Sequence, residues 1–247
     1  LLPVYNKTAG YADQGRRRKG AFMVTVPLWH LESLDVITIQ HPIQPPGRER
    51  LEHLFPALWV NELFHQRVVS NGQWSFFCPA DCPLLLTTYG AEFDAAYIEY
   101  ERQGKARKVM PAREVLNIIA KMQLESGVPY VHNADLINRC SNVRQIDGKD
   151  APVAHSNLCA EIVQPSTPEK PALCNLASIN LRRFLKGIEG KESGVEFDFQ
   201  KLKEVVALVV RSLDRVISVT KIFDEEGMGA HNKAVRPMGL GVQGFAD

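Results

Sequence analysis

The longest amphipathic stretch of the chain spans residues 198–222 and reads DFQKLKEVVALVVRSLDRVISVTKI. Its apolar side chains recur at intervals of three and four residues, which is the spacing of one helical face, and Asp198 is placed to cap the first turn. Residues 238–243, with the sequence MGLGVQ, form a short apolar run typical of a strand. A long helix next to a short strand is the pattern of an α/β protein.

The same alternation of short apolar runs and longer amphipathic stretches extends toward the N-terminus. Strands are expected at 21–28, 74–78, 129–131, 156–163 and 172–176, helices at 56–69, 90–103 and 111–126, and a loop at 42–47, where prolines and a glycine end regular structure. Short strands between long helices predict a mainly parallel sheet. In such sheets the carboxyl ends of the strands carry the chemistry.

The composition is that of an ordinary folded chain of one large or two small domains. The 247 residues are 45% hydrophobic and 23% charged, which excludes a disordered or collagen-like chain. Lys plus Arg number 29 against 28 for Asp plus Glu, so the net charge of +1 provides no general attraction to nucleic acid or to an anionic membrane. No apolar run reaches the ~20 residues of a membrane helix, and no secretory signal begins the chain. Five cysteines, an odd number, favour reduced thiols and a cytoplasmic protein.

Both ends of the sequence indicate an internal piece of a longer protein. The chain starts at Leu1 rather than at a methionine, and it stops at Asp247 directly after a glycine-rich stretch. We therefore expect flanking segments on both sides.

Residues 156–162, SNLCAEI, combine an amide, a thiol and a carboxylate with an apolar set. In an extended strand alternate side chains share a face, so Asn157, Cys159 and Glu161 would point one way and their apolar neighbours the other. Burying these three groups without partners is costly, and a ligand in a cavity would remove that cost. The alternative is an exposed strand face with solvated polar groups and an incidental cysteine, and spacing alone leaves both interpretations open.

The other cysteines are weaker candidates. Cys174 is either a redox thiol near the same cavity or a small buried hydrophobe. The spacing of Cys78 and Cys82 is wider than that of a zinc knuckle, and Cys140 would have to help complete a site. Buried structural thiols are therefore expected there, and no metal site.

Two further patterns suggest other chemistry. Gly239, Gly241 and Gly244 fit the spacing of a dinucleotide fingerprint, although no helix follows them in the sequence. His155 could activate Cys159 as a nucleophile, but four residues along a strand span about 13 Å, too far for a hydrogen bond.

The ordered set of motifs resembles one enzyme family. SNLCAEI at 156–162, followed by CNLAS at 174–178, resembles the active-site region of the large subunit of class I ribonucleotide reductase, in the style of the eukaryotic enzymes. Further matches follow in order along essentially the whole chain, at 4–9, 13–15, 20–22, 29–31, 74–79, 82–83, 126–130, 138–139 and 236–244. The resemblance implies that 1–247 is a fragment of the catalytic domain, a ten-stranded α/β barrel, with flanking N- and C-terminal parts missing. It also makes the glycine-rich stretch a barrel segment.

The resemblance implies a role for each matched residue in the reduction of ribonucleoside diphosphates to 2′-deoxyribonucleoside diphosphates. Cys159 would become a thiyl radical and take the 3′ hydrogen of the ribose, and Glu161 would be the general base on the 3′ hydroxyl. Asn157 would bind and orient the substrate. Cys174 would be one half of the dithiol that supplies reducing equivalents as the 2′ hydroxyl leaves as water.

The basic segment at 13–20, DQGRRRKG, corresponds in the resemblance to a loop that links the allosteric specificity site to the substrate base. The loop comprises Gln14, Gly15, Arg16, Arg17, Arg18, Lys19 and Gly20. It is one residue shorter than the family's common pattern and lacks its proline, and Arg18 is the arginine expected to contact a nucleotide. Without the resemblance, the segment is a solvated turn or a general phosphate patch.

The resemblance also implies partners outside the chain. The chain itself would bind no cofactor, the radical would come from a metal-containing small subunit, and the electrons would come from an external dithiol, thioredoxin or glutaredoxin. Nucleoside diphosphates would be the substrates, ATP, dATP, dTTP and dGTP the effectors, and the large subunit a homodimer. Neither nucleic acid nor membrane is an expected partner.

Several parts that the reaction needs are not expected within these residues. They include the thiol that pairs with Cys174, the substrate phosphate-binding loop and the tyrosines of radical transfer, so the isolated chain is expected to show no turnover. Two alternatives stay open: a non-radical cysteine enzyme that uses Cys159 and His155, and a catalytically inactive nucleotide-binding module of the same fold.

Overall fold

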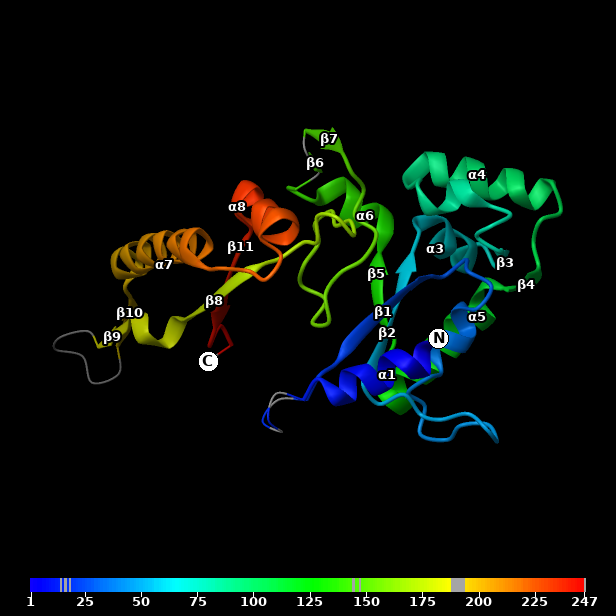
Figure 1. Ribbon diagram of the computed structural model, residues 1–247, viewed down its shortest axis with the longest axis horizontal. Helices are drawn as coiled ribbons and strands as arrows, with labels where there is room; N and C mark the ends of the chain where they lie inside the picture. The colour runs from blue at the N-terminus through cyan, green and yellow to red at the C-terminus, as the bar shows by residue number, and fades with distance from the viewer. Residues whose placement is uncertain are drawn as a thin grey trace. The chain divides into compact units, whose positions relative to one another are not determined.

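The computed structural model contains both helices and strands, which alternate from α1 to α6 (Figure 1). It describes residues 1–13, 15, 17, 19–143, 145–146, 148–187 and 194–246. The chain divides into two units, Leu1–Pro165 and Ser166–Asp247. Within the described ranges, none of the helices has the length and apolar character needed to cross a membrane. The α/β class predicted from the sequence is confirmed.

A three-stranded parallel sheet forms the centre of the first unit (Figure 1). Its order is β1 (Phe22–Pro27), β2 (Leu54–Val60) and β5 (Tyr130–Asn133), so β2 is paired on both sides. Parallel strands need long crossover connections, which helices usually supply. The helices of this unit are α1 (Leu2–Tyr11), α2 (Ser33–Ile37), α3 (Glu62–Val69), α4 (Gly90–Arg102), α5 (Ala112–Ser126) and α6 (Ala134–Cys140).

The central strand β2 corrects one prediction. The helix expected at 56–69 begins only at Glu62, and residues 54–60 form the strand instead. All but one of the strand's residues are buried, because a central strand covered on both faces is apolar throughout rather than alternating. An apolar run of this length has no periodicity that separates a buried strand from a buried helix.

The other elements expected between residues 21 and 131 are confirmed with shifts of a few residues at their ends. The strand at 21–28 is β1, that at 74–78 is β3 (Gln73–Phe76), and that at 129–131 is the start of β5. The helices at 90–103 and 111–126 are α4 and α5, and 42–47 holds no helix or strand. The sequence pattern did not predict α1, α2, α6 or β4 (Lys108–Pro111), which pairs antiparallel with β3.

An aromatic cluster fills the core of the first unit around β3. Its members, none more than 1% exposed, are Phe64, Trp74, Phe77, Phe93 and Tyr97. The Trp74 ring stacks on Tyr97 with the ring centroids 4.7 Å apart, and Phe64 meets Trp74 edge-on at 5.1 Å. The Tyr97 hydroxyl donates to the carbonyl of Ser75 at 2.9 Å, so the polar atom of the cluster is satisfied.

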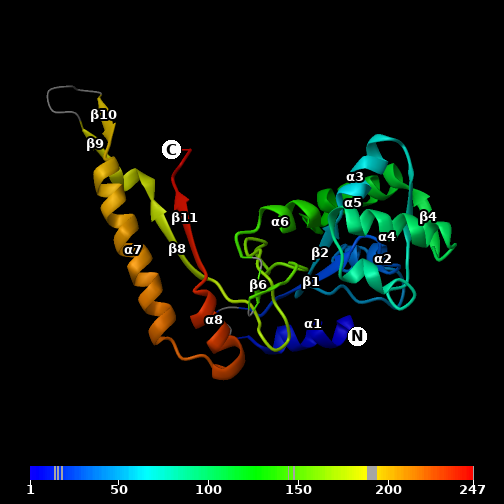
Figure 2. The ribbon, with the colours of Figure 1, turned by 90° about the horizontal axis from the view of Figure 1, so that it is seen from above.

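The second unit is built on two parallel strands and one long helix. β8 (Asn175–Asn180) pairs with β11 (Met238–Gln243), and α7 (Phe199–Val219) lies beside both (Figure 2). The helix predicted at 198–222 is confirmed, and the Asp198 carboxylate caps it by accepting from the Lys201 amide at 2.9 Å. The strand predicted at 238–243 is also confirmed, whereas the one expected at 172–176 starts three residues later, as β8. The shorter elements of the unit include η3 (Leu181–Phe184), β9 (Leu185–Gly187), β10 (Val195–Phe197), η4 (Glu225–Gly229) and α8 (Ala230–Val235).

Candidate functional site

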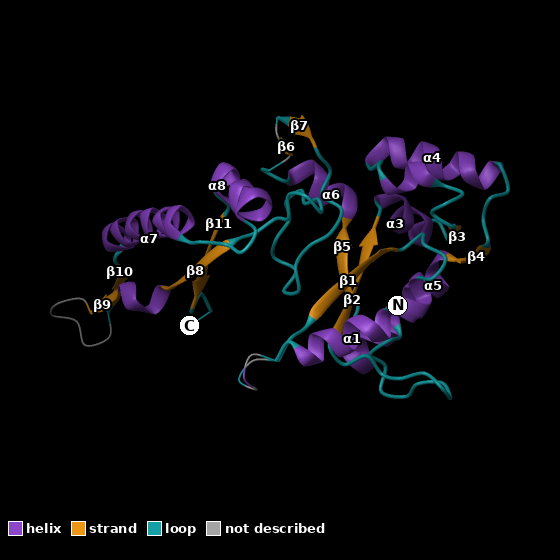
Figure 3. Ribbon diagram, in the orientation of Figure 1, coloured by secondary structure: helices purple, strands orange, loops and turns teal. Residues whose placement is uncertain are grey.

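The segment that carries Cys159 is a loop and not a strand. It follows β7 (Lys149–Asp150), the partner of β6 (Gln145–Ile146), and Figure 3 draws the chain from there to β8 as loop. Cys159 lies in a turn, and Ala160 has a φ of 65°, outside the β region. The strand predicted at 156–163 is therefore wrong, and so is the single strand face that was expected to carry the polar side chains.

The side chain of Asn157 explains the turn. Its Oδ1 accepts hydrogen bonds from the backbone amides of Glu161 at 3.1 Å and Ile162 at 3.0 Å, while its carbonyl accepts from the Ala160 amide at 2.9 Å. Asparagine side chains favour such local bonds, which compete with a strand ladder. The structure therefore brings the three candidate residues together in one tight turn rather than in a row along a strand.

The functional groups of this turn are accessible. Cys159 and Glu161 are exposed, and Asn157 is half-buried. Neither of the two exposed side chains, nor Nδ2 of Asn157, makes a hydrogen bond to any residue that the structure describes. An amide donor, a thiol and a carboxylate are thus available to a ligand.

Helix α6 ties both stems of the loop to the first unit. On the first stem, Nδ2 of Asn138 donates to the Val153 carbonyl at 2.9 Å, and Oδ1 of Asn138 accepts from the Val153 amide at 2.8 Å. On the second stem, the hydroxyl of Ser141, directly after α6, lies 3.1 Å from the carbonyl oxygen of Val163 and 2.8 Å from that of Val143, and it shares its proton between these two acceptors. We call residues 153–163 the Cys159 loop. Sequence reasoning quoted Asn138 only within a matched motif and missed this contact, because nothing local links it to Val153.

A cavity of about 210 Å³ lies beside the first stem, at the carboxyl ends of β1 and β2. Such ends are where parallel sheets usually bind ligands. None of the predicted site residues lines it. Its lining includes Pro27, Trp29, Trp59, Asn61, Thr87, Thr88, Tyr89, Asn138, Pro152, Val153 and Ala154.

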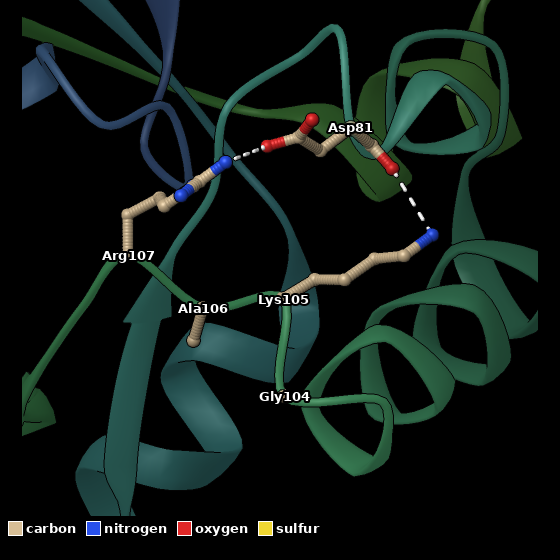
Figure 4. A pocket seen from close by; sticks show the side chains of 5 residues that line it. All are labelled: Asp81, Gly104, Lys105, Ala106 and Arg107. Atoms are coloured by element: carbon tan, nitrogen blue, oxygen red, sulfur yellow. Dashed lines mark hydrogen bonds and ion pairs between the residues drawn. The ribbon is translucent and has the colours of Figure 1, made fainter.

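A second hollow, of about 380 Å³, lies between Asp81 and the turn that joins α4 to β4 (Figure 4). Arg107 Nη2 pairs with Asp81 Oδ2 at 2.6 Å, and Lys105 Nζ donates to the Asp81 carbonyl at 3.2 Å. Both cations of the hollow therefore already have oxygen partners. Nothing in the sequence had pointed to this place.

Cys174 belongs to the second unit, directly before β8, and is partly buried. A Cβ on Gly239 of β11 would lie 2.6 Å from Cδ2 of Leu176 and 3.5 Å from the Cys174 sulfur, so a larger residue there would require the Leu176 side chain to move. The glycines of 239 and 241 lie inside this strand and not in a turn between strand and helix, which contradicts the dinucleotide-fingerprint alternative.

The remaining cysteine alternatives find little support in the geometry. All five cysteines are free thiols, and burial raises the pKa of Cys82. Across the described ranges, no group of three or more His, Cys, Asp or Glu side chains is placed to hold a metal ion. In the same ranges neither His155 nor Cys159 makes a side-chain hydrogen bond, so the structure shows no cysteine–histidine pair.

The basic loop is described only in part. Gly15 has a φ of 62°, and Arg17 and Lys19 are exposed. Gly20 is partly buried, and a Cβ there would collide with the carbonyl oxygen of Ala9. Gln14, Arg16 and Arg18 lie outside the described residues, so the nucleotide contact of Arg18 stays a prediction.

Comparison with known proteins extends the match to the whole chain. The family model for the ribonucleotide reductase barrel domain matches residues 1–247. The ribonucleoside-diphosphate reductase large subunit of Caenorhabditis elegans is 40% identical over 248 residues, covering 100% of this chain and 30% of that protein. The large subunit of Arabidopsis thaliana is 40% identical over 268 residues and the large chain of Schizosaccharomyces pombe 40% over 250, again with 100% of this chain covered.

The chain spans 31% of the length of the Arabidopsis protein and 29% of that of the Schizosaccharomyces protein. It therefore corresponds to about a third of a large subunit. The motifs that resemble this family lie in defined parts of the structure. SNLCAEI forms the Cys159 turn, and Cys174 lies beside strand β11 with its glycines. The chain belongs to the ribonucleotide reductase barrel-domain family.

Proposed function

We propose that the full-length protein carrying this chain is the large subunit of a ribonucleoside-diphosphate reductase. The observation that supports the proposal is the turn closed by Asn157. In a chain of this family, five consecutive residues of this turn present an amide, a thiol and a carboxylate. Its substrates are ribonucleoside diphosphates and its products their 2′-deoxy forms, for DNA precursor synthesis.

Cys159 performs the hydrogen-atom transfer in this proposal. As a thiyl radical, its sulfur takes the hydrogen atom from C3′ of the ribose, which forms an S–H bond and leaves the unpaired electron on C3′. Glu161 takes the proton of the 3′ hydroxyl, while the 2′ hydroxyl takes a proton from the dithiol that includes Cys174 and leaves as water. The exposed position of Cys159 supports this role because a ribose can reach the sulfur.

Cys174 supplies half of the reducing equivalents. Its thiol and a second thiol, from outside this chain, are oxidised to a disulfide as the sugar radical is reduced. Glu161 returns its proton to the 3′ oxygen, and Cys159 then returns its hydrogen atom to C3′. The net change converts one ribonucleotide and one dithiol into one deoxyribonucleotide, one disulfide and one water.

The two polar atoms of the Asn157 side chain, Oδ1 and Nδ2, have different roles. Oδ1 is engaged by the backbone of the turn, so Nδ2 is the atom left to donate to a ribose hydroxyl. One side chain thereby shapes the turn and orients the sugar within it, which is the preorganisation that a hydrogen-atom transfer needs.

The proposal includes partners that act on this chain. A metal-containing small subunit supplies the radical, thioredoxin or glutaredoxin restores the dithiol, and ATP, dATP, dTTP and dGTP act through residues 14–20 of a homodimer. We place the enzyme in the cytoplasm, where reducing conditions keep its cysteines as thiols.

Replacement of Cys159 by serine in the full-length protein tests the proposal. With small subunit, effector and dithiol present, Cys159→Ser should form no detectable dCDP from CDP, because an alcohol does not replace a thiol as the hydrogen-atom carrier. The matched control is Cys140→Ser, which removes another exposed free thiol and should keep wild-type turnover. Binding of CDP and the thermal midpoint should be unchanged in both variants.

Three outcomes would point elsewhere. Formation of dCDP by Cys159→Ser at the wild-type rate would contradict the assigned role. A covalent adduct on Cys159, with turnover indifferent to radical scavengers, would favour the non-radical cysteine enzyme. Binding of dTTP by the wild-type protein without any dCDP would favour the inactive nucleotide-binding module.

A further inference from the structure

The Cys159 loop has few ties to the body of the first unit. In the described part of the chain, the backbone between Pro152 and Val163 forms hydrogen bonds to residues outside this segment at Val153 and at Val163, and both lead to helix α6 or the residue after it. The turn of Asn157 closes the loop internally and adds no tie to the body. The position of the sulfur therefore depends on how α6 holds the two stems.

Asn138 makes the stronger of the two attachments. Its side chain is 5% exposed and uses both ends of the amide, with Nδ2 donating to the carbonyls of Val153 and Ala134 at 2.9 Å and Oδ1 accepting from the Val153 amide at 2.8 Å. The paired bonds to Val153 fix both the position and the orientation of that peptide. An apolar contact would restrict the position and the orientation of the peptide less, since dispersion forces have little directionality.

The first stem of the Cys159 loop also packs against the central sheet. The Val153 side chain is 2% exposed and packs in a small apolar cluster with Trp59 of β2 and Ala134 of α6. The amide of Asn138 thus joins the loop to the helix, and the apolar contact joins both to the central strand. A shift at Asn138 would be transmitted to the turn through the residues between Val153 and Asn157.

We infer that Asn138, assisted by Ser141, is a positioning residue that sets where Cys159 lies relative to the sugar. The inference rests on the proposed function of Cys159. Asn138 touches neither substrate nor reacting atoms in this assignment, and it acts by holding the stem of the loop.

The test uses the full-length protein with its small subunit and three variants of the stems. Asn138→Leu removes all three hydrogen bonds at similar volume, Asn138→Asp keeps an acceptor for the Val153 amide but loses the donor, and Ser141→Ala releases the second stem. Since misplacement of a reacting group by about 1 Å costs roughly 100-fold, kcat for CDP should fall by about that factor in Asn138→Leu. It should fall less in Asn138→Asp and only a few-fold in Ser141→Ala. KM should change less than kcat, because only the substrate contact of Asn157 lies in the displaced loop, whereas the sulfur must reach C3′ for each turnover.

A matched control separates positioning from loss of stability. Gln40 is another buried side-chain amide of the first unit, 6% exposed, and its Nε2 donates to the Leu54 carbonyl at 2.6 Å, outside the Cys159 loop. Gln40→Leu should lower the thermal midpoint as Asn138→Leu does but leave kcat unchanged. Hydrogen exchange should accelerate at the Val153 amide in Asn138→Leu and not in Gln40→Leu.

The failure of this inference differs from the failure of the proposed function. If Cys159→Ser abolishes turnover while Asn138→Leu has wild-type kcat or wild-type exchange at Val153, the positioning role alone is wrong. If Cys159→Ser keeps turnover, the proposed function is wrong whatever Asn138 does. Should Asn138→Leu fail to fold, wild-type kcat in both Asn138→Asp and Ser141→Ala would overturn the inference.

Discussion

Two regions of the first unit are held together by opposite means. The aromatic cluster around Trp74 and Tyr97 is stabilised by the burial of large rings, with one satisfied hydroxyl. What we call the polar junction consists of Asn61, Asp135 and Asn138 with the backbone groups that they bind, and it is equally buried, at 4%, 5% and 5% exposure. Burial alone therefore does not reveal what a region does. The cluster buries large apolar rings, whereas the junction binds the first backbone amides of two helices and the stem of the Cys159 loop.

Asp135 shows how the junction works. Its carboxylate accepts from Nδ2 of Asn61 at 3.1 Å and from the backbone amides of Glu62 at 2.6 Å and Gly90 at 2.7 Å. Glu62 and Gly90 are the first residues of α3 and α4. The backbone N–H groups of the first turn of a helix have no partner within that helix. A negative charge is also favourable at a helix N-terminus. One carboxylate in the first turn of α6 thereby fixes the starts of two other helices.

The largest effect on stability is expected from the aromatic cluster. Trp74→Ala should lower the free energy of unfolding by about 3–5 kcal/mol, because the change removes a fully buried ring and leaves a cavity. Urea unfolding of the full-length protein would measure it, with Val69→Ala on the exposed end of α3 as a control expected within about 0.5 kcal/mol. Turnover per folded molecule should be unchanged. A loss of kcat without a loss of stability would break the distinction between the two regions.

A smaller but more local effect is expected at the junction. Asp135→Ala leaves three donors without an acceptor, and at about 1 kcal/mol or more for each the free energy of unfolding should fall by roughly 3 kcal/mol. Asp135→Asn, which keeps an acceptor oxygen, should lose less. Hydrogen exchange should accelerate at the amides of Glu62 and Gly90 in Asp135→Ala. Uniform acceleration across the unit, as expected for Trp74→Ala, would show that the junction is only another part of the core.

The same contrast explains which features could be predicted from the sequence. Helix α7 was predictable because its apolar residues repeat along one face and Asp198 caps it, and β11 because it is a short run next to that helix. Strand β2 was not, since a strand buried on both faces has no alternation.

The residues of the candidate site could be named from the sequence, and their roles stay predictions, but the geometry of the site could not be predicted. The types and order of Asn157, Cys159 and Glu161 pointed to one constellation, yet alternation suggested a strand where the Asn157 amide forms a turn. The contact between Asn138 and Val153 could not be predicted, because the two residues are distant in sequence and are brought together only by the fold. Polar contacts of this kind leave no periodic signal.

The smallest expected effect on stability concerns His132 on β5. This polar side chain is buried in apolar surroundings, like the rings of the aromatic cluster. It is 6% exposed and lies against Trp59 with ring centroids 5.6 Å apart, and neither ring nitrogen has a hydrogen-bond partner in the part of the chain that the structure describes. Burial lowers its pKa below the usual value of about 6.5. The unfolded chain therefore binds a proton more readily than the folded one, so stability should fall as the pH drops below about 6.5 and be insensitive to this group above it.

His132→Leu should therefore raise the free energy of unfolding by about 1 kcal/mol at pH 7.5, since it removes unsatisfied nitrogens from the core. At pH 5.5 the gain should be larger, because the variant no longer has a group that takes up a proton on unfolding. Urea midpoints of both proteins at the two pH values would measure this, with the exposed His65→Leu as the control. A variant less stable than the wild type at both pH values would mean that His132 has a polar partner in the full-length protein. Position 132 would then belong with the polar junction rather than with the aromatic cluster.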